Sequence, residues 1–350
     1  MVMNVKGYAA LAVKEDLVPH NFVRRDPRED DVVIDILYSG VCHSDIHNAY
    51  NDWGGAKYPM VPGHEIIGRV VHVGKSVTKF KVGDLAGVGC MVDSCQHCSA
   101  CEQGLEQYCE EGNTLTYNDI DRHDGLPTFG GYSDKIVVTE KFVVKVPEGI
   151  DLLGAAPLLC AGITTWSPLR HWQVGEGSKV AVVGLGGLGH MAIKLANALG
   201  AEVTLFTRSP GKEADARRLG ASHVVLSTDS EQMKATANQF DLIIDTVPYV
   251  HDLNPYIPTL ALSGTLVLVG YLGALDPFLN TVPLILGRRS VAGSVIGGIA
   301  ETQEMMDFCG QHGITADVEV IDIQDINRAW QRMLKSDVKY RFVIDIASLK

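Results

Sequence analysis

Four closely spaced cysteines constrain the fold of this chain more than any other feature. Cys95, Cys98 and Cys101 form two overlapping Cys-x-x-Cys steps, and Cys109 follows after seven further residues. Four thiolates at such a spacing favour a tetrahedral structural zinc site, in which no ligand position stays open for a substrate. The sequence therefore predicts a lobe at about residues 90–112 that is organised by zinc.

Length, charge and cysteine usage limit the class of protein. A chain of 350 residues is too long for one small core and predicts two domains. The net charge of −12 argues against a nucleic-acid partner, because binding of phosphates needs a cationic surface. No apolar stretch reaches the ~18 residues of a membrane span, and no signal peptide is recognisable, so we expect a cytoplasmic protein.

The eight cysteines are expected to be metal ligands rather than disulfides, because the chain shows no export signal. Cys90 and Cys309 lie outside the metal-site patterns, and we expect them to be buried apolar thiols.

Hydrophobic patterns divide the chain into three segments. The first 152 residues are β-rich, with predicted strands at 32–37, 65–73 and 85–88. Residues 153–294 alternate strands with helices, which indicates a doubly wound parallel sheet. Residues 295–350 contain a helix near 302–312 and a strand at 340–345, and are predicted to return to the first domain. In the middle segment the predicted strands are 179–183, 202–207, 223–226, 241–245 and 265–269, and the predicted helices 188–199 and 212–219.

A glycine-rich turn joins the first of these strands to the first helix. It contains Gly184, Gly186, Gly187, Leu188 and Gly189 in the pattern Gly-x-Gly-x-x-Gly. The pattern alone is weak, but between a strand and a helix it predicts a dinucleotide site. Gly184 permits the turn, Gly186 the approach of a pyrophosphate, and Gly189 the packing of helix on strand. The helix N-terminus then offers N–H groups to the phosphates. A purely structural glycine turn is the alternative.

The end of the second strand in this segment distinguishes the two nicotinamide coenzymes. An NAD site usually has an acidic residue there, whereas this chain has Thr207, Arg208 and Ser209, with Lys212 close behind. The guanidinium, the ammonium and the hydroxyls suit a 2′-phosphate. The sequence thus favours NADP, although a solvated loop with ordinary surface cations remains possible.

Three further residues suggest a second metal site with one open position. Cys42, His64 and Cys160 are donor types that zinc prefers, but they lie far apart in the sequence. Spacing alone does not unite them, and a single histidine on an apolar segment is more often a core residue.

Local motifs give the chain a family resemblance from Asn4 to Asp345. The motifs are Gly40-Val-Cys-His-Ser-Asp45, Pro62-Gly-His-Glu65, the four-cysteine lobe and the glycine turn. The chain resembles the zinc-dependent medium-chain alcohol dehydrogenases. Within them it is most similar to the cinnamyl-alcohol-dehydrogenase branch and its bacterial NADPH-dependent aldehyde reductases. The narrower likeness rests on 158–165, 293–297 and 339–345. The resemblance implies an α/β protein, with a β-rich GroES-like catalytic domain (1–152 and 295–350) and a Rossmann-type domain (153–294).

The resemblance also implies roles for individual residues. Cys42, His64 and Cys160 would bind a catalytic zinc, Glu65 would lie behind them, and Asp45 would orient His64. Ser44 and His47 would form the two protein ends of a proton relay. The coenzyme would also contact His43, Thr164, Val269, Ser294, Ile296 and Arg341. His43 stands where the family usually has arginine, which weakens one phosphate contact. Trp53, Met91 and Trp166 are either pocket walls or core residues.

The function that the resemblance implies is interconversion of alcohols and aldehydes, chiefly NADPH-dependent reduction of an aromatic or aliphatic aldehyde. The open zinc would polarise the carbonyl and the coenzyme would supply hydride. An NAD-dependent polyol or sugar dehydrogenase and a zinc-free quinone reductase are alternatives on the same fold. A non-catalytic zinc interaction module is an alternative of another class. A homodimer is expected, paired along the strand near residues 290–295.

Overall fold

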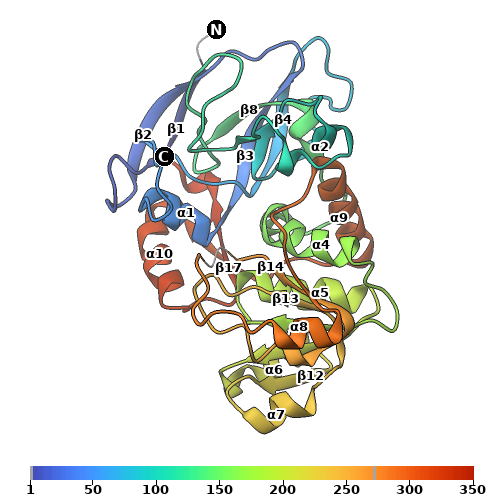
Figure 1. The fold of residues 1–350 in the computed structure, drawn as a ribbon. Helices are drawn as coiled ribbons and strands as arrows, with labels where there is room; N and C mark the ends of the chain where they lie inside the picture. Colours follow the sequence, from blue (N-terminus) through green and yellow to red (C-terminus); the bar gives the residue numbers. More distant parts are fainter. Residues whose placement is uncertain (1–2, 271–272) are drawn as a thin grey trace. The chain divides into compact units, whose positions relative to one another are not determined.

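The chain leaves its first unit after Cys160 and returns to it at Gly297 (Figure 1). This computed structural model describes residues 3–270 and 273–350. The second unit is the continuous segment Ala161–Ile296. The first boundary thus follows Cys160 rather than residue 152, because the helical segments at 152–159 belong to the first unit.

The first unit is built around strand β3 (Asp31–Val41), which is long and largely buried. It pairs antiparallel with β4 (Ile66–Val73), β8 (Lys135–Thr139) and β17 (Arg341–Asp345). Phe342 of β17 lies opposite Val41, so the last strand returns to the first domain as the sequence predicted. The sheet is completed by β5 (Leu85–Val88), β9 (Val144–Lys145) and β16 (Val318–Asp322).

Smaller elements of the first unit surround this sheet. They are the pairs β1 (Met3–Ala9) with β2 (Val18–Arg24) and β6 (Met91–Asp93) with β7 (Thr114–Leu115), and helices α1 (His43–Ala49), α2 (Ser99–Glu102), α3 (Leu152–Ala155), α9 (Ile299–His312) and α10 (Ile326–Leu334). Helix α1 begins directly after β3, so Cys42 lies at the junction of strand and helix.

The second unit contains a six-stranded, entirely parallel sheet in the order β12-β11-β10-β13-β14-β15. This order corresponds to 3-2-1-4-5-6, which is typical of dinucleotide-binding folds. The strands are β10 (Lys179–Val183), β11 (Glu202–Thr207), β12 (His223–Leu226), β13 (Phe240–Asp245), β14 (Leu260–Leu268) and β15 (Ser290–Gly293). The helices are α4 (Ala161–His171), α5 (Gly187–Ala198), α6 (Glu213–Leu219), α7 (Ser230–Ala235) and α8 (Val282–Gly287).

The sequence predicted β5, β10, β11 and β12 at their observed bounds, since each is a short apolar run between turn residues. The stop of α6 at Gly220 also agrees, because that glycine adopts φ 113°. Strand β14 begins five residues earlier than predicted, at Leu260, and ends one earlier, at Leu268. Strand β15 lies at the sheet edge, as predicted.

Among residues 3–270 and 273–350, no single helix has both the length and the apolar character needed to cross a membrane. Only the bent pair Leu152–Leu159 and Ala161–His171 meets that test together, by length and composition.

Candidate metal centres and coenzyme site

The four predicted structural-zinc cysteines converge in the first unit. Their sulfurs all lie within 4.8 Å of one another, although the residues are spread over two short helical turns and a loop. Cys98 forms the N-cap of α2, and Cys101 lies one turn later and is buried. Four thiols that meet in this way without pairing as disulfides fit a tetrahedral zinc ion.

Backbone N–H groups also point at these sulfurs. Cys98 N donates to Cys95 Sγ at 3.3 Å, Glu110 N to Cys98 Sγ at 3.4 Å, and Cys95 N to Cys109 Sγ at 3.4 Å. Such donors stabilise thiolates, and those from Cys101 and Glu110 lower the pKa of the Cys98 thiol to about 6. The loop therefore favours the ionised, metal-binding form at Cys98, whereas burial raises the pKa of Cys101 to about 12.

The second predicted set, Cys42, His64 and Cys160, also converges within the first unit. Together with Glu65, their donor atoms lie within 4.8 Å of one another, and the two sulfurs are 3.9 Å apart. All four residues are buried or nearly so. A hydrogen bond from the Cys160 thiol lowers the pKa of Cys42 well below its ordinary value. Two sulfurs and one imidazole nitrogen form the donor set of a catalytic zinc site.

Asp45 holds the ligand residues in place. Its fully buried carboxylate accepts from His64 Nδ1 at 3.0 Å, Cys42 N at 2.9 Å and Gly63 N at 3.2 Å. With Nδ1 engaged, the imidazole directs Nε2 toward the thiols. The charge of Asp45 also opposes the effect of burial and raises the pKa of His64 well above its ordinary value.

Two tyrosines that the sequence analysis missed complete this network. Tyr132 donates its hydroxyl to Asp45 Oδ2 at 3.1 Å, and Tyr117 stacks on the His64 ring with centroids 5.8 Å apart. The two glycines that directly precede Tyr132, Gly130 and Gly131, were the sequence signal that could have pointed to this tyrosine. A Cβ on either glycine would collide with neighbouring atoms, so these residues let Tyr132 approach the site.

Glu65 lies among the donor atoms rather than behind them, because one of its carboxylate oxygens is within 4.8 Å of the donors of Cys42, His64 and Cys160. Its Oε1 pairs with Arg341 Nη2, and its Oε2 has no hydrogen-bond partner among the described residues. Burial raises the pKa of Glu65 to about 7, although the charge of Arg341 opposes this effect. A cation beside the unpartnered Oε2 would favour the ionised carboxylate, which fits a zinc ion at this site. Gly40 is required here, since a Cβ on it would collide with Glu65.

The predicted relay residues occupy α1. Ser44 donates to Cys42 Sγ at 3.0 Å and lies 3.5 Å from His64 Nε2. His47 Nδ1 lies 2.9 Å from Asp52 Oδ2, and its ring packs on Trp53. Burial lowers the pKa of His43, so this residue is a weak phosphate partner compared with arginine. Arg341, predicted as a coenzyme contact, is buried and pairs with Glu65.

The glycine turn in the second unit has the geometry of a phosphate-binding loop. Gly184 adopts φ 91°, and an added Cβ on Gly189 would collide with Gly184 O. Nothing lies within 4 Å of a Cβ built on Gly186, which leaves room for a bound group. Gly186 caps α5, and Gly187 and Leu188 form its first turn, so free N–H groups of a 12-residue helix face this opening.

The residues after β11 lie beside this turn. Lys212 Nζ donates to Leu185 O at 2.9 Å, which ties the lysine to the glycine loop. Thr207 is buried and its hydroxyl accepts from Ser209 N at 3.2 Å, whereas Arg208 and Ser209 are exposed. Residues 207–212 contain no carboxylate, and in them Arg208 is exposed whereas Lys212 is half-buried.

Other predicted residues of the second unit are spread along it. Thr164 and Trp166 are buried in α4, which favours a core role for the tryptophan. Val269 N donates to Asp245 O and Ser294 N to Leu268 O, and Ile296 has φ 37°. In the first unit Met91 is buried and Trp53 is 44% exposed.

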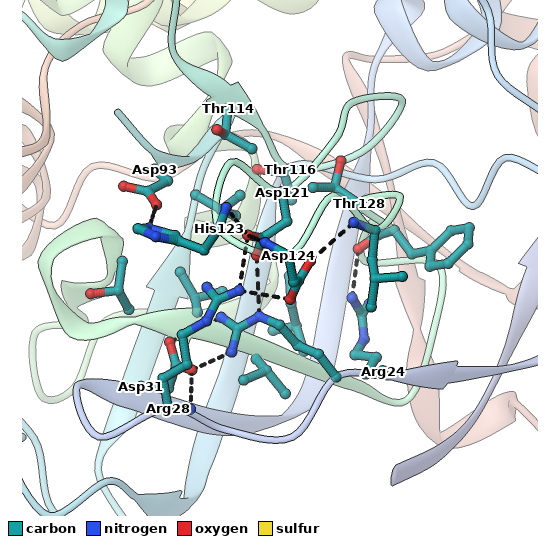
Figure 2. A pocket seen from close by; sticks show the side chains of 18 of the residues that line it. Arg24, Arg28, Asp31, Asp93, Thr114, Thr116, Asp121, His123, Asp124 and Thr128 are labelled. Atoms are coloured by element: carbon teal, nitrogen blue, oxygen red, sulfur yellow. Dashed lines mark hydrogen bonds and ion pairs between the residues drawn. The ribbon is translucent and has the colours of Figure 1, made fainter. Parts of the chain in front are cut away.

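A separate cavity of about 420 Å³ in the first unit holds none of the predicted site residues (Figure 2). Its charges pair with one another: Arg28 Nη2 lies 2.9 Å from Asp121 and 2.7 Å from Asp124, and His123 Nε2 lies 2.8 Å from Asp93. These pairs tie residues 121–124 to Arg28 and Asp93.

Comparison with known proteins places this geometry in a family. Residues 28–148 match the alcohol dehydrogenase GroES-like domain, and residues 187–311 match the zinc-binding dehydrogenase domain. The chain is 52% identical to aldehyde reductase YahK of Escherichia coli, over 99% of both chains. It is 52% identical to NADP-dependent alcohol dehydrogenase C 1 of Mycolicibacterium smegmatis, again over 99% of both.

A solved cinnamyl alcohol dehydrogenase of Sorghum bicolor has the same fold. It superposes with a TM-score of 0.96 at 47% identity, over 99% of both chains. The chain therefore belongs to the zinc-binding alcohol dehydrogenases that combine a GroES-like domain with a Rossmann-type domain.

Proposed function

We propose that this protein reduces aldehydes with NADPH, and oxidises the corresponding alcohols, at a zinc ion held by Cys42, His64 and Cys160. The observation that carries the proposal is the convergence of these three donors with Ser44 beside them. The names of the aldehyde reductase and the NADP-dependent dehydrogenase support the same activity. The direct test is a panel of aromatic and aliphatic aldehydes with NADPH and NADH, compared by kcat/KM.

The two units have different roles. The first unit, with both cysteine sets, acts as the catalytic domain, and the second, with the glycine turn, binds the coenzyme. When bound, zinc supplies Lewis-acid polarisation of the carbonyl and NADPH supplies the hydride. Four cysteines hold one zinc and Cys42, His64 and Cys160 the other. Six metal-binding thiolates suit a reducing compartment, and we place the enzyme in the cytoplasm.

The residues of α1 move the proton. The Ser44 hydroxyl is beside the metal ligands and can donate a proton to the substrate oxygen. His47 lies one helical turn further along α1, where it is partly exposed and hydrogen bonded to Asp52. It can therefore take up from solvent a proton that replaces the one given up by Ser44. Asp45 lies behind His64, where its contact with Nδ1 fixes the orientation of the imidazole.

The coenzyme is held mainly by the second unit. The N–H groups at the start of α5 receive the pyrophosphate, while Arg208 and Lys212, with the hydroxyl of Ser209, receive the 2′-phosphate. Thr164, Val269, Ser294 and Ile296 contribute to the nicotinamide side. An NAD-specific polyol dehydrogenase is disfavoured by the missing carboxylate after β11.

Metal analysis should find two zinc ions per chain. The two donor sets are separate and each is complete enough to hold one ion. Elemental analysis of freshly purified, active protein provides the measurement, with the protein concentration taken from amino-acid analysis. A value of one zinc or none in active protein would reject this assignment.

We also propose that two chains associate through the second unit. Within the described part of the chain, strand β15 leaves one edge of the parallel sheet unpaired. Large apolar side chains are exposed on α8 and its neighbours. Ile285 is 76% exposed, Leu286 81% and Leu262 73%. A two-fold axis at this edge would continue the sheet and cover the apolar side chains.

Sedimentation at micromolar concentration should therefore give twice the chain mass of 37.9 kDa. The double variant Ile285→Glu/Leu286→Glu should shift the protein to the mass of one chain, because four buried charges would oppose association. Val82→Glu, at a 60% exposed position of the first unit, is the matched control and should stay dimeric. A wild-type protein that sediments only as a monomer would contradict the proposal.

A further inference from the structure

A buried ion pair lies at the carboxyl end of the parallel sheet, outside the motifs used so far. Asp245 closes β13, and its side chain is fully buried. Its Oδ1 accepts from Val247 N at 3.1 Å, and its Oδ2 lies 2.8 Å from His251 Nε2. The loop that follows β13 is thus folded back on its own strand by this carboxylate.

The hydrogen bonds of His251 define its charge. Nδ1 lies 2.9 Å from the carbonyl oxygen of Tyr249, and Nε2 faces the carboxylate of Asp245. Both partners accept hydrogen bonds and neither donates, so both ring nitrogens must carry hydrogen. Burial alone would lower the pKa of His251, but the bond to Asp245 outweighs it and raises the pKa above its ordinary value. The imidazolium is therefore the form that this site holds.

This pair lies next to the proposed coenzyme site. Strands β11 and β13 flank β10, whose end leads into the glycine turn. A Cβ on Gly184 of that turn would lie 3.2 Å from the side chains of Thr246 and Val247, in the loop after β13. Arg208, from the end of β11, is near enough for its charge to lower the pKa of both His251 and Tyr256.

We propose that His251 determines the preference for NADPH by neutralising Asp245. The inference rests on the proposed 2′-phosphate site at Arg208 and Lys212. The bare carboxylate of Asp245 would otherwise repel a dianionic phosphate bound beside it. His251 is thus a positioning residue that acts through charge, since its two N–H groups are already used within the protein.

The pH dependence of this effect has a defined sign. A raised pKa means that the positive charge is complete below the ordinary value near 6.5 and is lost as the pH rises through the higher, folded value. The other groups that face His251 are the carboxylate of Asp245, the guanidinium of Arg208 and the rings of Tyr249 and Tyr256. A 2′-phosphate is fully ionised above about pH 7. Preference for NADPH over NADH should therefore fall in alkaline solution.

The experiment compares kcat/KM for NADPH and NADH at pH 7 and pH 9, in wild type and three variants. His251→Gln removes the cation, and Asp245→Asn/His251→Gln removes both charges. His223→Gln, an exposed histidine paired with Glu202, is the control. Calorimetric binding of adenosine 2′,5′-bisphosphate gives a second readout without turnover, and the melting temperature reports folding.

At pH 7 we expect His251→Gln to lower the ratio of kcat/KM for NADPH to kcat/KM for NADH about three- to tenfold. The value of kcat/KM for NADH itself should stay nearly unchanged. The double variant should recover most of that loss, and the control should match wild type. In wild type the ratio should fall between pH 7 and pH 9, whereas in His251→Gln it should stay flat. The wild-type profile alone tests the idea if a variant fails to fold.

Three results would each overturn this inference. They are an equal loss of kcat/KM for both coenzymes in His251→Gln, no recovery of the NADPH-to-NADH ratio in the double variant, and a wild-type ratio that does not change with pH. A wild type without NADPH preference at pH 7 would reject the 2′-phosphate site itself, and the inference with it. A preference that His251→Gln leaves intact rejects the inference alone.

Discussion

Replacing Cys160 with alanine should lower kcat for aldehyde reduction at least about a thousandfold while the protein stays folded. Zinc polarisation of a carbonyl contributes several kcal/mol to transition-state stabilisation, and about 4 kcal/mol corresponds to that factor. Cys160 is one of two thiolates in the open set, and the remaining donors, Cys42 and His64, would hold the ion too weakly. Zinc content should fall from two ions to one per chain, while far-ultraviolet circular dichroism stays close to wild type.

Cys309→Ala is the matched control, because Cys309 is buried in the same unit but belongs to neither cysteine set. It should keep two zinc ions and most activity. Cys98→Ala should act differently from Cys160→Ala, since it removes a ligand from the lobe that zinc organises. Limited proteolysis should then cut within residues 90–112. Full activity in Cys160→Ala, or retention of two zinc ions there, would contradict the assignment of the open site.

Replacing Arg208 with alanine should reduce kcat/KM for NADPH about ten- to a hundredfold. A charge-assisted hydrogen bond contributes roughly 1.5–3 kcal/mol, and about 1.4 kcal/mol corresponds to each factor of ten. NADH should be nearly unaffected, because it has no phosphate at this position. Steady-state kinetics with both coenzymes measures the difference.

The double variant Thr207→Asp/Arg208→Ala should move the preference toward NADH. The Thr207 hydroxyl already accepts from Ser209 N at the strand end, and an aspartate there would face the ribose hydroxyls and repel a phosphate. Arg217→Ala, on α6 and paired with Glu213, controls for loss of a nearby cation. If Arg208→Ala lowers kcat/KM for NADPH and for NADH equally, the loop after β11 does not distinguish the two coenzymes.

Local signals made the second unit the easier part to predict. The bounds of β10 and β11 follow from short apolar runs that end at glycine or polar residues, and the turn between β10 and α5 has its own glycine pattern. The four-cysteine lobe was predictable for the same reason. All of its ligands lie within fifteen residues, from Cys95 to Cys109.

The open metal set was not derivable from spacing. Cys42, His64 and Cys160 are brought together by pairing between distant strands, and only the family resemblance joined them. The pairing of Glu65 with Arg341, 276 residues away, had no local signal either. Tyr117 and Tyr132 were missed because a buried aromatic residue looks the same in sequence whether it fills a core or supports a ligand.

The return of β17 to β3 sets an order for biosynthesis. Ribosomes make residues 341–345 after every strand with which they pair, and the continuous segment Ala161–Ile296 is complete earlier. Domains generally fold as units, so that segment can fold while the first 160 residues still wait for their last strand. During that interval Glu65 lacks Arg341. The proposed site of Cys42, His64 and Cys160 therefore reaches its final charge balance only when synthesis is nearly finished, whereas the proposed four-cysteine site can take up zinc much sooner.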